Sequence, residues 1–501
     1  MNLRAATALL LACAPLHAAE RPDLLRFTNG DQLHGAFLGI EAGPQAVWKR
    51  DDLAEPVRFK TSGVRHIVLR GGQPAKGLAT LSNIGLANGD RIPGTVTAMD
   101  AEFLTIDSEW AGTLRVPRNQ VAMLAPNPLG GRIHYHGPFA ADGWRMAHAA
   151  FPKGLPEVKE EEKTKDDDEA PGRWQFSGAA WYWKGDRTGT ALIRPDGMTD
   201  RSVLRFDLAW KNRLNLAVAF HADLAVPPPP AGEEGKEAAR VPGNGDNSVF
   251  STMFGNSYVL QMFSSYFILY RTGIDDEGNG TIERVRLNNS NLRLGETGRA
   301  SVEIRSNRRS GLISLFINDE FVSQWSEGAA DARENSEFAG KGPGFGFVVQ
   351  GEESPVRISD IVVSEWNGMP DSARSLEVED QDVVLMANGT DRFAGKVTGM
   401  EGDGRLAFEG RHGRFTFPLS EVAEVRFARS GLAAAPDTPS ENIAVRLHPF
   451  GLVSGRPVSG DASSISINHS VLGSVRLSTA SAVMIEFNSS NQIIDDWDTD
   501  F

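Results

Sequence analysis

The sequence predicts an all-β protein in which a central two-sheet sandwich is flanked on each side by two copies of a small β unit. The first observation is a period of two. Residues 300–325 alternate apolar and polar side chains, as in Val302–Arg305, and turns at 307–311 and 318–320 interrupt them. Such alternation is typical of antiparallel strands with one buried face. The second observation is an Asn-Gly turn between short strands, which recurs on both sides of the central block.

Length and composition are those of a globular chain with an acidic balance. The 501 residues suggest about three domains of roughly 150 residues each. Hydrophobic residues make up 41% of the chain and charged residues 23%, which is enough apolar material for sizeable cores. The net charge of −14 disfavours a nucleic-acid partner, because phosphate binding needs a basic face. It also disfavours docking on anionic lipid.

Residues 1–19 have the sequence pattern of a secretory signal peptide. Arg4 supplies a positive charge, an apolar run extends from Ala5 to Ala14, and a small residue at Ala18 offers a cleavage site. The run is too short for a spanning helix, which needs about 20 apolar residues, and no later segment is long and apolar enough to span. We therefore expect an exported bacterial protein, located in the periplasm, in the extracellular space or at the cell surface.

The single cysteine, Cys13, lies inside this segment. Residues 10–13 (LLAC) resemble a bacterial lipobox, in which the cysteine becomes the site of a lipid anchor. Simple cleavage near Ala18 or Ala19 is the favoured alternative. In both cases the mature chain has no disulfide, so its stability has to come from its cores.

Four segments share the order of elements of a small β unit: strand, tight turn, glycine, two strands, bend and final strand. Asn-Gly supplies the positive φ of a tight hairpin. Gly35, Gly94 and Gly395 each follow the turn aspartate by four residues, where a strand bends strongly. The fourth segment lacks Asn-Gly but keeps Gly451 and Gly455. We name the segments units 1 to 4 and place them at residues 23–71, 79–125, 377–428 and 441–488, followed by an acidic tail at 489–501.

A period of about 50 residues with five short strands predicts that each unit is a small SH3-like or Sm-like barrel. A solenoid fits less well, because the copies are separated by the central block. The units also resemble the "NGD…G" β modules of exported bacterial proteins.

The central sandwich is predicted at residues 137–368, with about a dozen strands and with polar loops at 153–172 and 226–247. Five stretches of this block carry a resemblance to a known fold: Asp200–Trp210, Asn256–Phe263, Val302–Asp319, Gly342–Gln350 and Val356–Gly368. They resemble a concanavalin A-like jelly roll of the laminin G and glucanase kind. Within that fold the chain is also similar to the bacterial domain linked to 3-keto-glycoside hydrolysis. The resemblance implies a carbohydrate ligand, although a fold by itself does not decide function.

The catalytic residues of these families are missing from the matching positions. Glucanases of this fold carry Glu-x-Asp-x-x-Glu, which sets two carboxylates about 5 Å apart for retaining chemistry, and the chain has no such motif. The keto-glycoside domain commonly has Tyr-Glu-x-Gln, whereas Tyr258-Val259-Leu260-Gln261 stands here. Because valine neither accepts a proton nor binds a metal, the sequence favours binding over catalysis.

Two segments are compatible with a metal ion, and each has a simpler interpretation that we favour. Residues 275–282 begin like a calcium loop, but position twelve is Arg286 instead of a bidentate glutamate, which favours an acidic hairpin turn. His134 and His136 lie on one face of a short strand without a third ligand, which favours a local surface pair over a zinc site. We expect no metal and no cofactor.

The candidates for ligand binding are Trp183, Tyr258, Gln261 and Arg271. Sugars stack on flat aromatic rings, and the two polar residues interrupt apolar strands, so we expect these groups to face a ligand groove. The alternatives are that the rings fill the core between the sheets, where aromatics are common, and that the polar groups are buried and satisfied.

Three functions follow from this pattern. The first is an exported, non-catalytic protein that binds a carbohydrate or another surface partner. The second is a glycoside hydrolase acting on (3-keto-)glycosides at a site that the spacing does not reveal. The third is a structural or assembly protein of the cell envelope, in which the units contact an envelope protein.

Overall fold

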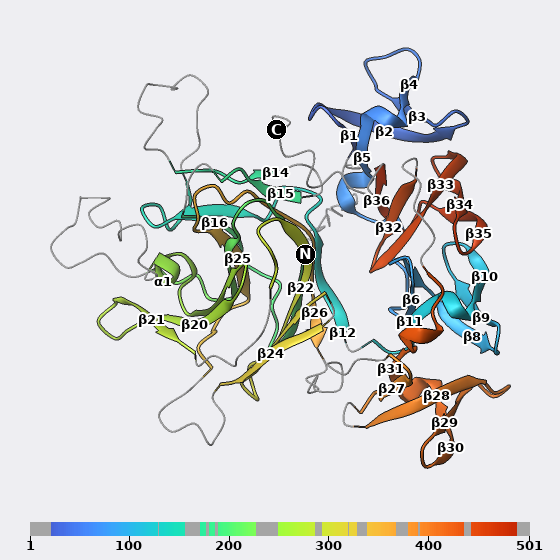
Figure 1. Ribbon diagram of the computed structural model, residues 1–501. Coiled ribbons are helices and arrows are strands. Elements are labelled where there is room, and N and C mark those ends of the chain that lie inside the picture. Colours follow the sequence, from blue (N-terminus) through green and yellow to red (C-terminus); the bar gives the residue numbers. More distant parts are fainter. Residues whose placement is uncertain are drawn as a thin grey trace, which may run out of the picture.

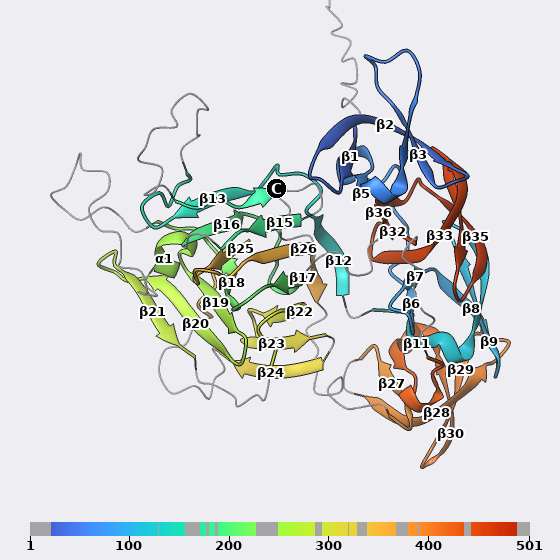
Figure 2. The same ribbon diagram turned by 45° about the horizontal axis from the view of Figure 1, so that its top comes forward.

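The structure is a computed structural model of the chain (Figures 1 and 2). The all-β prediction is confirmed, since strands make up most of the described elements. Cys13 and the rest of the predicted signal peptide, most of the two polar loops, Arg286 and the acidic tail lie outside the described residues. Among the described residues, no helix has both the length and the apolar character that a membrane crossing requires. The structure describes residues 22–128, 130–155, 171–176, 180–185, 189–226, 249–285, 293–318, 320–327, 338–366, 379–388, 391–434 and 442–487.

Two antiparallel sheets form the predicted sandwich. The first strand of the sandwich, β12 (Gly130–Gly137), starts earlier than the predicted boundary at 137, and it belongs to the sandwich because it pairs with β26 (Val356–Trp366). The first sheet contains, in spatial order, β14 (Gln175–Phe176), β15 (Ala180–Trp183), β26 (Val356–Trp366), β17 (Arg201–Trp210), β22 (Gly298–Asn307), β23 (Leu312–Ile317) and β24 (Glu320–Ser326), with β12 (Gly130–Gly137) beside β26. The second sheet contains β13 (Arg145–His148), β16 (Thr190–Arg194), β25 (Gly344–Val349), β18 (Asn215–Ala222), β19 (Ser257–Phe263), β20 (Phe267–Ile274) and β21 (Gly280–Arg284).

Side chains that alternate along the strands fill the space between the two sheets. On β22, Val302 and Ile304 belong to the buried core, while Glu303 and Arg305 lie on the outer face of the sheet. Inward residues of β17, β18, β25 and β26 join the same core. Full burial of one such aliphatic side chain contributes about 1.5–3 kcal/mol, so the period of two decides which face of each strand is buried.

A short helix that was not predicted covers part of the outer face of the second sheet. α1 (Val249–Phe254) packs Phe250 and Phe254 in one cluster with Ala217 and Ala219 of β18. The small alanine side chains leave room for the helix. The outer face of the first sheet meets the β units instead (Figure 2).

The four units share one pattern of strand pairing. The first strand pairs with the second and the fifth, and the second, third and fourth strands pair in succession. In unit 2 the second strand is divided into β7 and β8. The assignment of the units to the SH3-like or Sm-like class stays a prediction. The strands are β1 (Asp23–Phe27), β2 (Gln32–Glu41), β3 (Gln45–Lys49), β4 (Val57–Lys60) and β5 (Val64–Val68) in unit 1; β6 (Asn83–Leu86), β7 (Arg91–Pro93), β8 (Thr95–Met99), β9 (Phe103–Ser108), β10 (Gly112–Pro117) and β11 (Val121–Ala125) in unit 2; β27 (Asp382–Met386), β28 (Arg392–Met400), β29 (Arg405–Gly410), β30 (Gly413–Pro418) and β31 (Val422–Arg426) in unit 3; and β32 (Ile443–Leu447), β33 (Gly451–Asp461), β34 (Ser464–His469), β35 (Gly473–Ser478) and β36 (Ala482–Phe487) in unit 4.

The glycine that follows each turn lets two strands approach closely. A Cβ added at Gly35, Gly94, Gly395 or Gly455 would lie between 2.3 and 2.9 Å from a backbone carbonyl oxygen of the third strand. Contacts that short do not occur in proteins, so a side chain would push the two strands apart. Close backbone packing therefore explains the spacing of these glycines.

Units 1 and 3 each have an aspartate at the equivalent position of the first strand, and the sequence pattern did not single it out. Asp23 at the start of β1 accepts hydrogen bonds from the N–H groups of Phe37 at 2.8 Å and Arg70 at 2.6 Å. Asp382 makes the equivalent pair of bonds in unit 3, at 2.7 and 2.9 Å. Each aspartate thereby joins the first strand to the second strand and to the residues that follow the fifth.

The units form one curved row beside the sandwich, in the spatial order 1, 4, 2, 3 (Figures 1 and 2). β5 of unit 1 pairs with β36 of unit 4, β33 of unit 4 pairs with β7 of unit 2, and β11 of unit 2 pairs with β31 of unit 3. The C-terminal units therefore interleave with the N-terminal ones, although the whole sandwich separates them in the sequence.

Candidate functional site

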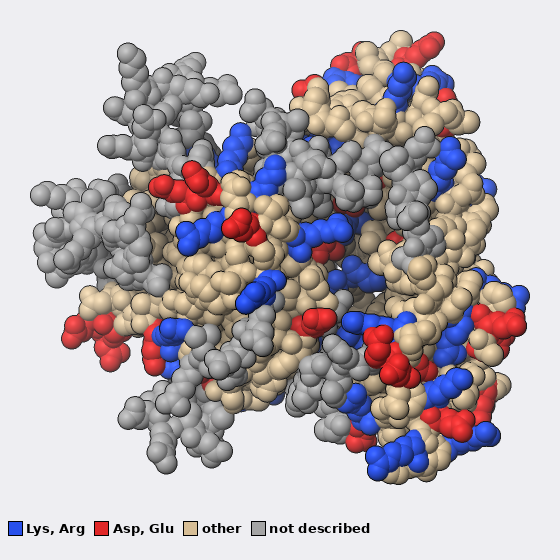
Figure 3. Space-filling model, viewed as in Figure 1, with Lys and Arg blue, Asp and Glu red and all other residues tan. Residues whose placement is uncertain are grey.

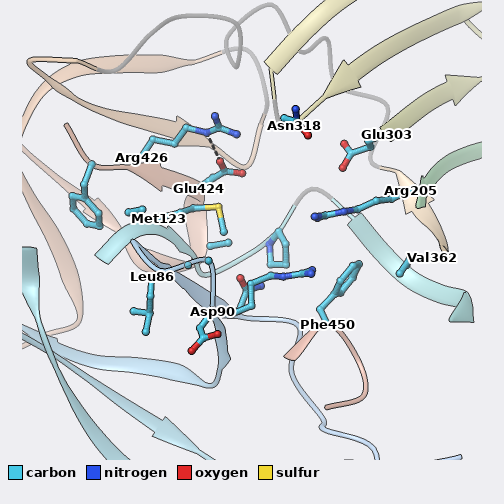
Figure 4. A pocket seen from close by; sticks show the side chains of 18 of the residues that line it. Leu86, Asp90, Met123, Arg205, Glu303, Asn318, Val362, Glu424, Arg426 and Phe450 are labelled. Atoms are coloured by element: carbon cyan, nitrogen blue, oxygen red, sulfur yellow. Dashed lines mark hydrogen bonds and ion pairs between the residues drawn. The ribbon is translucent and has the colours of Figure 1, made fainter. Parts of the chain in front are cut away.

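A cavity lies at the seam between the outer face of the first sheet and units 2, 3 and 4 (Figure 4). Its volume is about 460 Å³, which is within the range of ligand pockets, about 300–1,000 Å³. Basic side chains gather along the hollow where the sandwich meets the units (Figure 3). We call this space the seam cavity. The charged and aromatic residues that line it are Asp90, Arg91, Arg205, Glu303, Arg305, Glu424, Arg426, Phe427, Arg429 and Phe450.

The sandwich contributes a wall with two arginines and one carboxylate. Arg205 of β17 and the pair Glu303 and Arg305 of β22 reach the outer face because they alternate with inward residues such as Ile304. Arg305 donates to Glu303 from Nε at 2.5 Å, and its guanidinium lies over the Phe316 ring, 4.7 Å from the centroid. These contacts hold both side chains in place at the wall.

Unit 3 contributes the facing wall with the same Glu-x-Arg spacing. Glu424 and Arg426 of β31 alternate with Val425, which is buried in the core of the units, so the two charged residues lie on the outer side. Arg426 donates to Glu424 from Nε at 2.7 Å. Figure 4 shows Glu303 and Glu424 on facing walls. A ligand in the cavity would therefore meet a carboxylate–guanidinium pair on two sides.

Units 2 and 4 close the cavity. Asp90, which is buried, accepts hydrogen bonds from the N–H and Oγ of Ser454 at 3.1 and 2.8 Å and contacts Nε2 of His469 at 2.8 Å. The Asn-Gly-Asp turn of unit 2 thereby docks unit 4. Phe450 presents an aromatic ring to the cavity, and the guanidinium carbon of Arg91 lies 5.7 Å from the centroid of that ring.

One hydrogen-bond acceptor in the lining has no protein partner. Asn83 is 7% exposed, and its Nδ2 donates to the carbonyl oxygen of Leu81 at 2.8 Å. Its Oδ1 has no hydrogen-bond partner within the part of the chain that the structure describes. An unsatisfied buried acceptor costs about 1–3 kcal/mol, so a hydroxyl or water bound here would be stabilised.

A buried ion cluster beside the cavity joins the sandwich to units 2 and 4. Opposite β17, β26 contains one extra residue, Asp360, whose φ is 47°, and this bulge turns its carboxylate toward the units. Oδ2 of Asp360 lies 2.8 Å from Nη1 of Arg446 and 3.7 Å from Nη2 of Arg91, and Oδ1 lies 3.2 Å from Nε2 of His136. Arg446 also contacts Glu486 at 3.3 Å. The cluster positions the units on the sheet.

Burial and neighbouring charges shift the ionisation of this cluster. Burial alone would raise the pKa of Asp360, but Arg446, His136 and Arg91 together hold this pKa well below its usual value. Burial, and then the charge of Arg205, lower the pKa of Arg91 to about 10. Positive charge is therefore crowded at the edge of the seam cavity.

His136 and His448 stack across the seam, with ring centroids 5.7 Å apart. Burial, and then the nearby His136, lower the pKa of His448 to about 4. The prediction of a local surface pair at His134 and His136 is wrong for His136, whose side chain is 5% exposed and belongs to the ion cluster. Within the described residues, no group of three or more His, Cys, Asp or Glu is arranged to hold a metal ion.

The four residues predicted to bind a ligand do not lie together. Trp183 of β15 packs in the core between the sheets and is 1% exposed. Tyr258 and Arg271 are register partners on β19 and β20, whereas Gln261 pairs with Ala217 on the opposite face of the same sheet. The expectation that Gln261 and Arg271 face one groove is therefore wrong. The part of each residue in ligand binding stays a prediction.

Tyr258 and Arg271 share one buried carboxylate. The Tyr258 hydroxyl donates to Oε2 of Glu327 at 3.1 Å, and Arg271 donates to both oxygens of Glu327 and to Glu283. Burial is the main cause that raises the pKa of Tyr258 above its ordinary value. This arrangement corresponds to the alternative of a buried, satisfied polar group for Tyr258, whereas Arg271 is satisfied but only half-buried.

On the opposite face, the amide nitrogen of Gln261 has two hydrogen-bond partners. Its Nε2 donates to Oδ1 of Asn215 at 3.0 Å and to Oε1 of Gln350 at 2.9 Å. Val259, at the position where the resembling hydrolase domain has glutamate, belongs to the apolar cluster under α1. This face thus offers no carboxylate at the position that the resemblance would require.

The acidic loop at residues 275–282 is a hairpin turn, as favoured from the sequence. β20 and β21 pair on either side of it. Oδ1 of Asp275 accepts the N–H groups of Glu277 at 3.0 Å and Asn279 at 2.7 Å, so this oxygen is used by the turn itself.

The residues of the seam cavity were missed because they are far apart in the sequence. A local signal does exist, since Glu303-Ile304-Arg305 and Glu424-Val425-Arg426 repeat one pattern of opposite charges around a buried aliphatic residue. Spacing along the chain does not show that the two strands face each other.

No family model and no curated protein sequence matches the chain. Solved structures to which the chain is similar include a protein of unknown function with a galectin-like fold from Bacillus subtilis, at 12% identity and a TM-score of 0.28, covering 47% of this chain and 97% of that one. The carbohydrate binding module CBM66 from Bacillus subtilis has 9% identity and a TM-score of 0.24, covering 39% of this chain and 92% of the module. A putative glycosyl hydrolase from Parabacteroides distasonis has 14% identity and a TM-score of 0.24, covering 45% and 89%.

Proposed function

We propose that this chain is an exported, non-catalytic protein that binds a carbohydrate in the seam cavity. The lining of the cavity carries the proposal: two Glu–Arg pairs, the buried oxygen of Asn83, which has no partner among the described residues, and the Phe450 ring surround a space of about 460 Å³. Carboxylate and amide oxygens accept hydrogen bonds from hydroxyl groups, and guanidinium groups donate to ring and hydroxyl oxygens. An aromatic ring packs against the apolar face of a sugar. The lining therefore suits a polyhydroxylated ring.

A cavity-filling variant tests the location of the site. Met123 is half-buried in the lining, and Met123→Trp should fill the space and weaken glycan binding by at least about tenfold. Val458→Trp, at an exposed position on unit 4, is the matched control and should bind like the wild type. Binding would be measured on a glycan array and by ligand-observed NMR. A wild-type protein that binds no glycan would contradict the proposal.

The same assay separates the seam cavity from the site predicted on the sandwich. Gln261→Ala, on the outer face of the second sheet, would weaken binding at the site predicted there, whereas Met123→Trp would leave that site intact. Turnover of a 3-keto-glycoside would support the hydrolase alternative instead of a binding protein. Export would be tested by cell fractionation, with Cys13→Ala to separate lipid anchoring from simple cleavage.

The assembly alternative is favoured by a separate observation. The units are hydrogen-bonded to one another into a single row, and Arg70 of unit 1 donates to the Thr479 carbonyl of unit 4 at 3.0 Å, as a rigid scaffold requires. Co-purification with a stoichiometric envelope protein, without any sugar binding, would favour this alternative over the proposal.

A further inference from the structure

The seam cavity carries more positive than negative charge, although the whole chain has a net charge of −14. Five arginines line it against three carboxylates, and the arginines come from the sandwich, from units 2 and 3 and from the residues directly after unit 3. A basic cavity in an acidic protein draws an anionic ligand more strongly than its surroundings do. The arginines are Arg91, Arg205, Arg305, Arg426 and Arg429.

The three carboxylates are already engaged by protein groups. Asp90 contacts His469 and accepts two hydrogen bonds from unit 4. Glu303 and Glu424 each pair with the arginine two residues further on the same strand. The lining is therefore left with two more arginines than carboxylates.

Arg91 shows the effect of this excess. Arg91 lies 3.7 Å from the carboxylate of Asp360, whereas Arg446 lies only 2.8 Å from the same carboxylate. Burial and the nearby charge of Arg205 lower the pKa of Arg91. A bound anion would relieve the repulsion between the arginines.

Resting on the proposed function, we infer that the sugar bound in the seam cavity is acidic, with a carboxylate on a polyhydroxylated ring. The planar guanidinium fork matches a carboxylate with two parallel hydrogen bonds. The hydroxyl groups of the same ring can donate to Oδ1 of Asn83, and also to the carboxylate oxygens of Glu303 and Glu424 beside their arginine partners. An inorganic anion without hydroxyl donors would pair with the arginines and donate no hydrogen bond to Oδ1 of Asn83.

Calorimetry with matched pairs of sugars tests the inference. The probes are cellobiouronic acid against cellobiose, and oligomannuronate and oligogalacturonate against their neutral counterparts. The expected result is that at least one acidic member binds about tenfold more tightly than its neutral counterpart. The difference should shrink in 0.5 M salt, since salt screens charges at the open side of the cavity.

Two variants test whether the arginines bind the carboxylate of the sugar. Arg429→Gln, at an exposed position of the lining, should weaken binding of the acidic sugar about fivefold and leave a neutral sugar unaffected. Arg205→Gln tests the opposite wall in the same way. Arg414→Gln, on the far hairpin of unit 3 with its side chain 85% exposed, is the matched control. Circular dichroism melting curves would verify that each variant is folded.

The outcomes separate the inference from the proposal on which it rests. Neutral sugars that bind in the cavity as tightly as acidic ones would overturn the inference and leave the proposed function standing. Acidic binding that survives both arginine variants unchanged would also overturn it. The absence of binding to either class would overturn both.

Discussion

Replacing Asp360 by asparagine removes the charge that joins the sandwich to units 2 and 4. Asparagine tolerates the positive φ of the bulge as well as aspartate does. The substitution therefore leaves the backbone strain unchanged and alters the free energy of unfolding through electrostatics. Asp360 has two arginines and one histidine within 3.7 Å, and its side chain is 9% exposed. Removing one partner of a buried ion pair costs about 3–5 kcal/mol.

The lower end of this range applies here. Arg446 keeps Glu486 as a partner at 3.3 Å, while Arg91 loses the carboxylate at 3.7 Å and stays beside the charge of Arg205. We therefore expect Asp360→Asn to lower the free energy of unfolding by about 3 kcal/mol. The measurement is urea denaturation at pH 7, followed by circular dichroism and tryptophan fluorescence.

A substitution at an exposed aspartate is the control for this experiment. Asp276→Asn, at an exposed position in the hairpin between β20 and β21, should change the stability by less than about 0.5 kcal/mol. A loss below about 1 kcal/mol for Asp360→Asn would refute the reasoning, because the cluster would then contribute no more than an exposed ion pair does.

Three further predictions concern the seam, a unit and the sandwich. His448 binds fewer protons in the folded chain than in the unfolded one, because its pKa falls to about 4, so stability present above pH 6.5 is lost as the pH falls toward 4. His448→Gln should reduce this loss of stability in acid by about 1 kcal/mol, after allowance for partial solvent screening. The exposed control His412→Gln should leave the loss unchanged. The measurement is the free energy of unfolding in urea at pH 7 and at pH 4.5. Gly395→Ala should destabilise the protein by about 1–3 kcal/mol, since its Cβ would lie 2.3 Å from a carbonyl oxygen, while Gly402→Ala meets nothing within 4 Å and should be neutral. Equal stabilities of these two variants would contradict the close-approach argument. Tyr258→Phe should cost about 1–2 kcal/mol through the hydrogen bond lost from a buried carboxylate, and an unchanged melting temperature would contradict this role.

The amino-acid sequence determined the local structure of this protein. The period of two along residues 300–305 decides that Val302 and Ile304 enter the core between the sheets and that Glu303 and Arg305 lie on the opposite, outer face. Asn-Gly turns and the glycine four residues after the turn aspartate set the close strand pairing in the units. These features depend on side chains within a few residues of each other, so spacing along the chain is sufficient to predict them.

Only the tertiary structure decided which of these local elements meet. The unit order 1, 4, 2, 3 depends on the fit of strand edges that are hundreds of residues apart, as where Asp90 accepts hydrogen bonds from Ser454. The bulge at Asp360 and the facing walls of Glu303 and Glu424 arise from the same long-range packing. A one-dimensional pattern specifies the face of a strand, whereas a cavity between two bodies depends on their relative placement, which is set by the surfaces that they bury together.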